Sequence, residues 1–134
     1  MDASAERYEL LDLIGAGGMA EVYRARMLGA AGFSKIVAIK RILDECSTDD
    51  EFVQRFIDEA RLTAALVHPN ICQILDFGVM EGRHFIAMEY VEGLDLAGVL
   101  TGLDRSHERV PIDVVLYVTS CILRGLKHAH EAMD

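Results

Sequence analysis

The sequence has few basic residues, and only three of them are lysines: Lys35, Lys40 and Lys127. Its 134 residues carry 22 acidic side chains against 13 basic ones, which gives a formal net charge of −9 at pH 7. Phosphate backbones and anionic membrane surfaces are bound through clustered lysine and arginine. The composition therefore argues against nucleic acid or a membrane surface as a partner.

Closely spaced cysteines are also absent. Cys46, Cys72 and Cys121 stand far apart with no CxxC pair, which argues against a disulfide framework or a zinc site and fits a reducing cytosol. Residues 1–6 have neither the basic nor the apolar segment of a signal peptide. The longest nearly apolar stretch, residues 114–126, is too short and too polar to span a bilayer. We therefore expect a soluble, cytoplasmic chain.

The sequence does contain enough apolar residues, 51%, to fold, so disorder is not expected. Its length suits one compact domain or part of a larger one. Period-two alternation predicts strands at residues 8–14 and 21–26, and a β-branched run at 36–39 predicts a third strand that ends at Lys40. Glycine-rich residues 15–18 and small residues 28–32 separate these strands.

Residues 52–66 follow with apolar side chains at steps of four, which predicts an amphipathic helix. Thr48 and Glu51 have the spacing of a capping box at its start, and His68-Pro69-Asn70 ends it. Two more strands are predicted at residues 71–79 and 84–90, joined by a turn at Glu81-Gly82. After a linker, Pro111 opens a last helix.

The glycine-rich segment, residues 14–22, is the first candidate for chemistry. Glycines let backbone amides approach a phosphate group closely, although such a cluster is equally often a plain tight turn. A dinucleotide-binding or Walker loop must open into a helix, whereas the residues after this turn alternate as a strand, and no Gly-Lys-Ser/Thr follows. The pattern therefore favours a hairpin that covers phosphates, as in protein kinases, and excludes a dinucleotide-dependent oxidoreductase.

Lys40 is the second candidate. A lysine that closes a buried strand costs stability unless it is paired. The strand period puts Ala38 on the same face as Lys40, and Glu59 lies on the packed side of the following helix, from which it could reach Lys40. Without the other motifs, the interpretation of Lys40 as a plain exposed lysine at the end of a strand has equal weight.

Together these segments resemble the amino-terminal lobe of the eukaryotic-like serine/threonine protein kinases, notably the bacterial ones. Five motifs carry the resemblance in the family's order and spacing. They are Ile14–Val22, Val37-Ala38-Ile39-Lys40, Phe56–Arg61, His68-Pro69-Asn70-Ile71 and Met88–Gly93. The match runs from Tyr8 to the last helix.

The resemblance implies an α+β fold: a kinase amino-terminal lobe with a five-stranded antiparallel sheet and one helix of the αC type, followed by helices of a truncated carboxy-terminal lobe. The implied boundaries are an extension at residues 1–7, the ATP-binding lobe with its hinge at 8–93, and the start of the carboxy-terminal lobe at 94–134.

The resemblance also implies ATP as the ligand, with Lys40 as the cation on the α- and β-phosphates and Glu59 as its ion-pair partner. Glu89 and Val91 would offer a backbone carbonyl and amide to adenine, next to the gatekeeper Met88. Asp95 would accept from a ribose hydroxyl, or would simply start a helix, with equal weight. The implied ATP-binding residues are Ile14, Gly15, Ala16, Gly17, Gly18, Met19, Ala20, Glu21, Val22, Ala38, Lys40, Met88, Glu89, Val91 and Asp95.

Two further matches are interpreted as coincidence. Asp76-Phe77-Gly78 spells the family's magnesium-binding triplet, but it precedes the hinge and falls on a predicted strand. His128 and His130 point to different sides of a helix and have no further ligand at metal spacing, so they are expected at the surface. No metal site is predicted.

The resemblance stops at residues 125–131, before the family's His-Arg-Asp catalytic loop. No catalytic aspartate or magnesium ligand is therefore identified, although the family uses Mg-ATP. The sequence predicts the ATP-binding portion of a serine/threonine protein kinase that is inactive alone. The alternative is a non-catalytic, pseudokinase-like module that binds nucleotide or regulates a partner.

The last predicted helix generates the first test. Its apolar stripe contains Val114, Val118, Ile122 and Leu126, and needs the missing lobe or a protein partner to cover it. We expect the isolated chain to be poorly soluble or to self-associate, which its oligomeric state in solution checks. A clean monomer with the far-UV stability of a complete domain would contradict this expectation.

Overall fold

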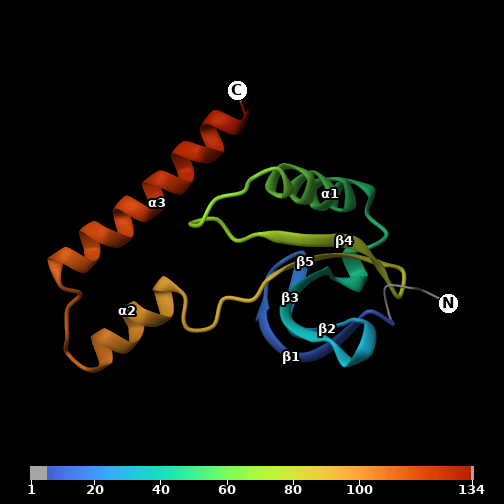
Figure 1. Ribbon diagram of the computed structural model, residues 1–134, viewed down its shortest axis with the longest axis horizontal. Coiled ribbons are helices and arrows are strands. Elements are labelled where there is room, and N and C mark those ends of the chain that lie inside the picture. The colour runs from blue at the N-terminus through green and yellow to red at the C-terminus, as the bar shows by residue number, and fades with distance from the viewer. Residues whose placement is uncertain (1–5, 134) are drawn as a thin grey trace. The chain divides into compact units, whose positions relative to one another are not determined.

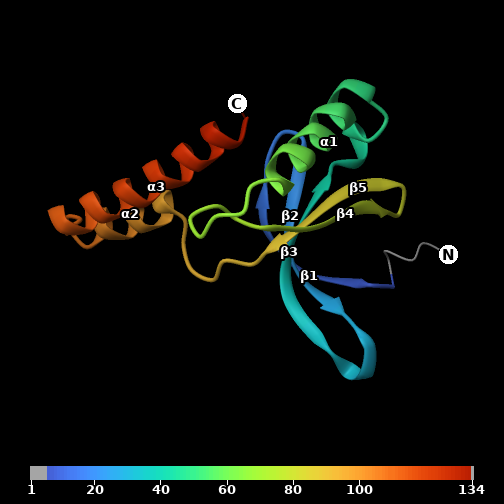
Figure 2. The same cartoon turned by 45° about the horizontal axis from the view of Figure 1, so that its top comes forward.

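The computed structural model describes residues 6–133 and divides the chain into two compact units. The first unit comprises Met1–Val67 and Cys72–Tyr90, and the second comprises His68–Ile71 and Val91–Asp134. The chain therefore leaves the first unit after Val67, contributes His68–Ile71 to the second unit, and re-enters the first unit at Cys72. Figures 1 and 2 show the elements of each unit.

The first unit contains the five-stranded sheet that the sequence predicts. Its strands are β1 (Tyr8–Ala16), β2 (Ala20–Leu28), β3 (Ser34–Ile42), β4 (Ile74–Met80) and β5 (Arg83–Glu89). Their order across the sheet is β1-β2-β3-β5-β4, and every neighbouring pair is antiparallel. β3 therefore lies in the middle of the sheet, between β2 and β5 (Figure 1).

The β4–β5 connection is a tight hairpin at Glu81-Gly82, as predicted. Glu81 and Gly82 have φ values of 52° and 76°, and two successive positive φ values match the right-handed twist of the flanking strands. The predicted end of β3 is wrong: the strand continues past Lys40 to Ile42, because Arg41 pairs with Phe85 and Ile42 with Ala20.

Helix α1 (Asp50–Ala64) packs its apolar stripe on one face of the sheet. Its amino-terminal cap is Asp49 rather than the predicted Thr48: the Asp49 carboxylate accepts hydrogen bonds from the Glu51 and Phe52 amides at 3.0 and 3.4 Å. Aspartate and threonine both cap helices, so the spacing in the sequence does not decide whether Thr48 or Asp49 is the cap. The cluster beneath α1 contains Ala20, Ile42, Cys46, Phe56, Ala60 and Ile86.

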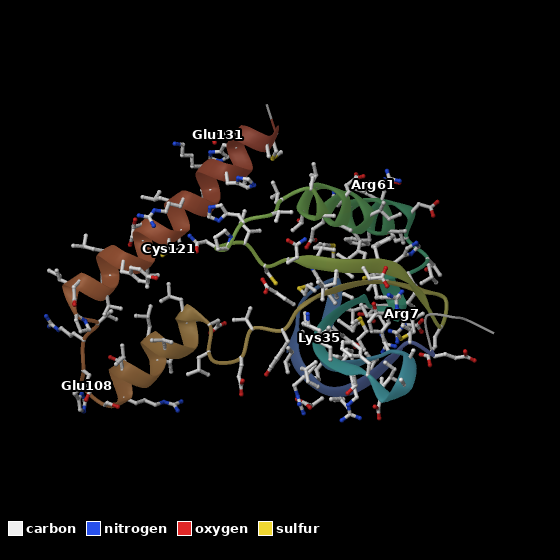
Figure 3. The ribbon with its side chains drawn as sticks, in the orientation of Figure 1. Arg7, Lys35, Arg61, Glu108, Cys121 and Glu131 are labelled. Carbon is white, nitrogen blue, oxygen red and sulfur yellow. The ribbon has the colours of Figure 1, made fainter. Side chains whose placement is uncertain are left out.

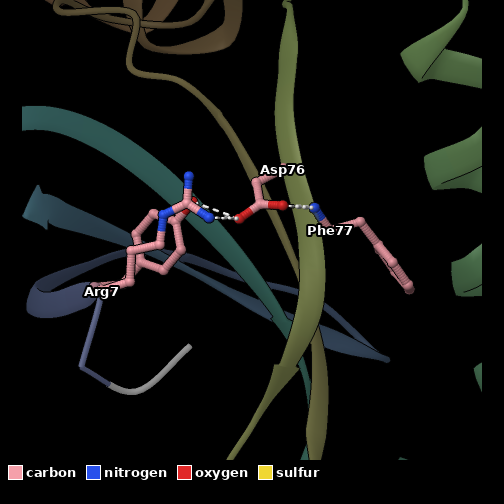
Figure 4. Close-up of polar contacts among 4 residues, drawn as sticks. Arg7, Asp76 and Phe77 are labelled. Carbon is pink, nitrogen blue, oxygen red and sulfur yellow. Dashed lines mark hydrogen bonds and ion pairs between the residues drawn. The ribbon is translucent and has the colours of Figure 1, made fainter. Parts of the chain in front are cut away.

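The other face of the sheet is buried by the curvature of the sheet itself. It encloses Tyr8, Ala25, Val37, Ile39, Met80, Phe85 and Ala87. β1 and β4 are the two outer strands, yet the Tyr8 hydroxyl donates to the Asp76 carboxylate across 2.8 Å. The curled strands are visible in Figure 2, and Figure 4 shows Asp76 between Arg7 and Phe77. We call these contacts of Arg7 and Tyr8 with Asp76 the edge contact.

The second unit contains helices α2 (Leu96–Arg105) and α3 (Ile112–Met133). α3 begins after Pro111, as predicted. α2 occupies a segment that the chain's periodicity assigns to a linker, although the helix-start alternative for Asp95 and the helices implied by the resemblance both anticipate it. Gly98 and Gly102 lower the helix propensity of this segment, which explains why the periodicity misses the helix. Within the unit, the Asn70 side-chain amide donates to the Cys121 carbonyl at 2.9 Å, and Gly125 is buried beside Asn70.

The predicted apolar stripe of α3 is largely exposed: Val114, Ile122 and Leu126 are 43%, 49% and 48% accessible. Figure 3 shows the side chains that project from α3, with Cys121 and Glu131 labelled along it. His130 is exposed, but the surface position expected for His128 is only partly right, because its half-buried ring lies 5.1 Å from that of His68. Among the described helices, none is long and apolar enough to cross a bilayer.

The edge contact generates a pH prediction. Burial, and then the hydrogen bond to Asp76, raises the pKa of Tyr8 from 10.0 to about 12. Because the folded-state pKa is the higher one, the stability linked to Tyr8 is fully present below pH 10 and is lost as the pH rises toward 12. The free energy of unfolding, measured by urea denaturation, should fall over this range, and less so in Tyr8→Phe. Parallel pH profiles of the two proteins would contradict the assignment.

Candidate nucleotide site

A cavity of about 370 Å³ lies in the first unit between the β1–β2 turn, β3 and helix α1. The turn and its flanks, residues 15–20 and Val22, form one wall, and Lys40 contributes from β3. The glycine loop and Lys40, two separate motifs in the sequence, thus line one cavity. Its full lining is Gly15, Ala16, Gly17, Gly18, Met19, Ala20, Val22, Lys40, Ile42, Phe52, Arg55, Phe56 and Glu59.

The glycines of this loop are not required by its backbone conformation. None of them has a positive φ. A Cβ atom on Gly15 or Gly17 would have its nearest neighbour at 3.8 Å, an ordinary contact, and one on Gly18 would meet nothing within 4 Å. The fold therefore has room for side chains here. The lack of side chains leaves space in the cavity wall, where a ligand can approach the backbone closely.

The loop is held by the segment that connects β3 to α1. The Leu43 amide donates to the Met19 carbonyl at 2.8 Å, and the buried Cys46 thiol lies 3.9 Å from the Gly18 carbonyl. Within the turn, the Gly17 amide donates to the Ala20 carbonyl at 2.9 Å. Leu43 and Cys46 carry no motif, so the sequence gives no indication of this support.

Lys40 and Glu59 form an ion pair inside the cavity. The Lys40 ammonium lies 2.6 Å from the Glu59 carboxylate, and their side chains are 27% and 50% exposed. The ammonium also lies 5.9 Å from the centre of the Phe56 ring, within range of a cation–π interaction. Strand register fixes the lysine opposite Val22 and Ile86, while the helix presents Phe56 and Glu59 three residues apart on one face.

Four lining residues are absent from the sequence-based set: Ile42, Phe52, Arg55 and Phe56. Three of them belong to α1, and the helical period that places Glu59 toward the sheet also brings Phe52, Arg55 and Phe56 to that side. The helical period alone was therefore enough to predict that these three residues face the same side as Glu59. Arg55 forms an exposed ion pair with Glu51 one turn earlier.

Other expected ATP-binding residues do not line this cavity. Ile14 is 47% exposed, and the Glu21 carboxylate accepts a 2.6 Å hydrogen bond from the Tyr23 hydroxyl. Ala38 and Met88 pair with each other across β3 and β5, and Ala38 is 6% exposed.

The expected hinge residues are placed as follows. Glu89 ends β5; its carboxylate accepts from the Gln73 amide at 3.0 Å, and its carbonyl lies 3.5 Å from the Cys72 thiol. Partial burial, and then the Glu89 charge, raises the pKa of Cys72. In the second unit, Val91 is 71% exposed. The Asp95 carboxylate caps α2 by accepting from the Gly98 amide at 2.7 Å, which is the helix-start role; its contact with a ribose hydroxyl stays a prediction.

The Asp76-Phe77-Gly78 triplet lies on β4, as predicted, and does not line the glycine-loop cavity. Both oxygens of the Asp76 carboxylate accept hydrogen bonds: one from Tyr8 and Arg7, the other from the Phe77 amide (Figure 4). A carboxylate engaged in this way does not suit Mg²⁺, which binds through carboxylate oxygens and retained waters. Within residues 6–133, no three His, Cys, Asp or Glu side chains are grouped to hold a metal ion.

Comparison with known proteins places this arrangement in a family. Residues 8–133 match the family model of the protein kinase domain. The tyrosine-protein kinase MasK of Myxococcus xanthus (strain DK1622) is 46% identical over 124 residues, which are 92% of this chain and 19% of MasK. The serine/threonine-protein kinase PrkC of Bacillus subtilis (strain 168) is 37% identical over 125 residues, 93% of this chain and 18% of PrkC.

A solved structure of the kinase domain of PknI from Mycobacterium tuberculosis superimposes with a TM-score of 0.72 at 32% identity. The superposition covers 93% of this chain and 48% of the PknI chain. The chain thus spans about half of a solved kinase domain and about a fifth of each curated relative above. The family match over residues 8–133 and the shared fold lead to one conclusion: this chain belongs to the protein kinase family.

Proposed function

We propose that this chain binds ATP in the glycine-loop cavity and is the nucleotide-binding part of a serine/threonine protein kinase. One observation carries the proposal: the Lys40–Glu59 ion pair, at 2.6 Å, lies in the same cavity as a glycine loop whose glycines the backbone does not require. A cation beside a wall without side chains suits a polyphosphate.

Lys40, Glu59 and the glycine loop each have a proposed task. Lys40 supplies the positive charge for the phosphates, and Glu59 holds its ammonium in the cavity when no ligand is present. The loop from Gly15 to Ala20 covers the phosphates and excludes water from them. Bound ATP supplies the γ-phosphoryl group that the family transfers, and these residues bind and orient it.

We further propose that these 134 residues bind nucleotide without transferring phosphate efficiently. Phosphoryl transfer needs an aspartate that accepts the proton of the attacking hydroxyl and carboxylates that hold Mg²⁺. The sequence has no His-Arg-Asp loop, and the carboxylate of its Asp-Phe-Gly triplet is engaged by Tyr8 and Arg7. No step through a metal ion is therefore assigned to these residues.

The acceptor residue is the finer part of the proposal. PrkC and PknI are similar to this chain over most of its length and are named serine/threonine-protein kinases, which supports serine or threonine. MasK, at 46% identity, is named a tyrosine-protein kinase. The similarity is therefore compatible with either class of hydroxyl, and the serine/threonine assignment rests on the larger number of relatives described.

The second candidate is a non-catalytic module that regulates a partner. The exposed apolar side chains of α3 favour it, since Val114, Ile122 and Leu126 form a surface that another protein segment can cover. The rest of a kinase domain would serve as that segment equally well. Nucleotide binding separates the candidates only in part, because the second candidate includes modules that bind nucleotide as well as modules that do not.

The test is a thermal melt with and without ATP. A ligand at 100 times its Kd stabilises the folded state by about 2.7 kcal/mol, which for a chain of this size raises Tm by roughly 5–10 °C. We expect this shift in the wild type and its loss in Lys40→Met. Lys127→Met, which removes an exposed lysine on α3, is the matched control and should keep the shift. No shift in the wild type at any ATP concentration would leave only the interaction module.

A further inference from the structure

We propose that Asp76 is a positioning residue for Lys40: its carboxylate joins β1 to β4 and thereby holds Phe77 against Phe56, the ring beside the Lys40 ammonium. The inference depends on the proposed function in one respect only: the assignment of Lys40 as the residue that binds phosphate. The coupling itself is a property of the unliganded first unit. Asp76 touches neither the cavity nor a reacting atom, so its role is indirect.

The first step is the edge contact. One carboxylate oxygen of Asp76 accepts from the Tyr8 hydroxyl at 2.8 Å and from the Arg7 guanidinium at 3.3 Å. β1 and β4 share no backbone hydrogen bonds, because three strands separate them in the sheet. The contact therefore fixes the curvature of the sheet at its outer strands. Figure 4 shows the Arg7 and Asp76 side chains pointing toward each other from these segments.

Only the Tyr8 side of the edge contact is shielded from water, since the Arg7 and Asp76 side chains are 56% and 31% exposed. Tyr8 is 4% exposed, and its ring packs edge-to-face on Phe85 at 5.4 Å. The Arg7 guanidinium lies 5.7 Å from the centre of the same Tyr8 ring. A hydrogen bond between a buried hydroxyl and a carboxylate is stronger than one between neutral groups, and its loss leaves a buried polar group unpaired.

The second step runs from Asp76 to helix α1. The other carboxylate oxygen accepts from the Phe77 amide at 2.9 Å, which fixes the backbone from which the Phe77 ring projects. This ring lies between two others, 6.5 Å from Phe56 on α1 and 5.7 Å from His84 on β5. A change in the Asp76 backbone therefore reaches α1 through one aromatic contact.

The third step reaches the ion pair. Phe56 is 4% exposed and has little freedom to move independently of its neighbours. The Lys40 ammonium lies 5.9 Å from its ring, and Glu59 follows it by three residues on the same helix. A displacement of Phe56 thus moves the ring beneath the cation and the carboxylate that binds it. Both determinants of the Lys40 position thus lie on the helix that Phe77 contacts, although Phe77 is itself 37% exposed and Phe56 also packs in the cluster beneath α1.

The experiment measures how fast Lys40 reacts with an amine-modifying reagent in the absence of nucleotide. The chain has three lysines, so Lys35 and Lys127 serve as internal references in the same peptide map. In Asp76→Ala we expect the rate at Lys40, relative to Lys127, to rise by at least about fivefold, because the loss of one ordinary hydrogen bond shifts an opening equilibrium by that factor and the Asp76 carboxylate accepts three. An unchanged ratio in folded Asp76→Ala would overturn the proposal.

Three further variants make the result specific. Asp76→Asn keeps an acceptor for the Phe77 amide but sets its NH2 group against the Arg7 guanidinium and the Tyr8 hydroxyl, so it should raise the ratio less than Asp76→Ala does. Tyr8→Phe removes only the hydroxyl and should raise the ratio; it carries the test if Asp76→Ala does not fold. Asp12→Asn, the matched control, breaks the exposed Asp12–Arg24 pair and should leave the ratio unchanged. A rise in Asp12→Asn equal to that in Tyr8→Phe would overturn the proposal.

Mg-ATP affinity provides an independent readout. A positioning role predicts that Asp76→Ala and Tyr8→Phe weaken the affinity together. A metal-binding role for the triplet predicts instead that Asp76→Asn weakens Mg-ATP binding strongly while Tyr8→Phe retains the wild-type affinity, and this result would overturn the proposal. Because the labelling experiment contains no nucleotide, a failure of the proposed ATP function would leave its outcome interpretable.

Discussion

The position of Lys40 in the sheet is the constraint on which the site depends. Lys40 belongs to the middle strand of a sheet that is covered on one face by α1 and enclosed on the other by its own curvature. Glu59 supplies an anion for this cation at 2.6 Å. Because the two side chains are 27% and 50% exposed, their ion pair orients the lysine within the cavity more than it stabilises the fold.

The periodicity of the sequence was sufficient to predict the parts of this arrangement that repeat. Alternation placed Lys40 and Ala38 on one face of β3, and helical spacing placed Glu59 on the packed side of α1. The same reasoning missed Phe52 and Phe56 as cavity residues, although they share that side. Local pattern therefore predicts which face a residue occupies, but tertiary packing decides what that face encloses.

Contacts between strands that are distant in the sheet were beyond sequence reasoning. The rejection of Asp76-Phe77-Gly78 as a metal triplet agrees with its place on β4, yet nothing in the spacing of the residues connects Asp76 with Tyr8. Their meeting depends on the curvature of the whole sheet, which no short motif encodes. The helix α2 was anticipated only through the helix-start alternative for Asp95 and through the family resemblance, because its two glycines weaken the periodic pattern.

The support of the glycine loop by residues 43–46 has a consequence for how the family can vary in length. The Leu43 amide and the Cys46 thiol meet consecutive carbonyls, those of Met19 and Gly18. An inserted or deleted residue in this connector would bring different groups to those carbonyls and change the shape of the cavity wall. The connector before α1 is thus a spacer whose length is set by the loop it supports. The turn at Glu81-Gly82 lies outside the cavity lining, so only the hairpin that it closes limits its length.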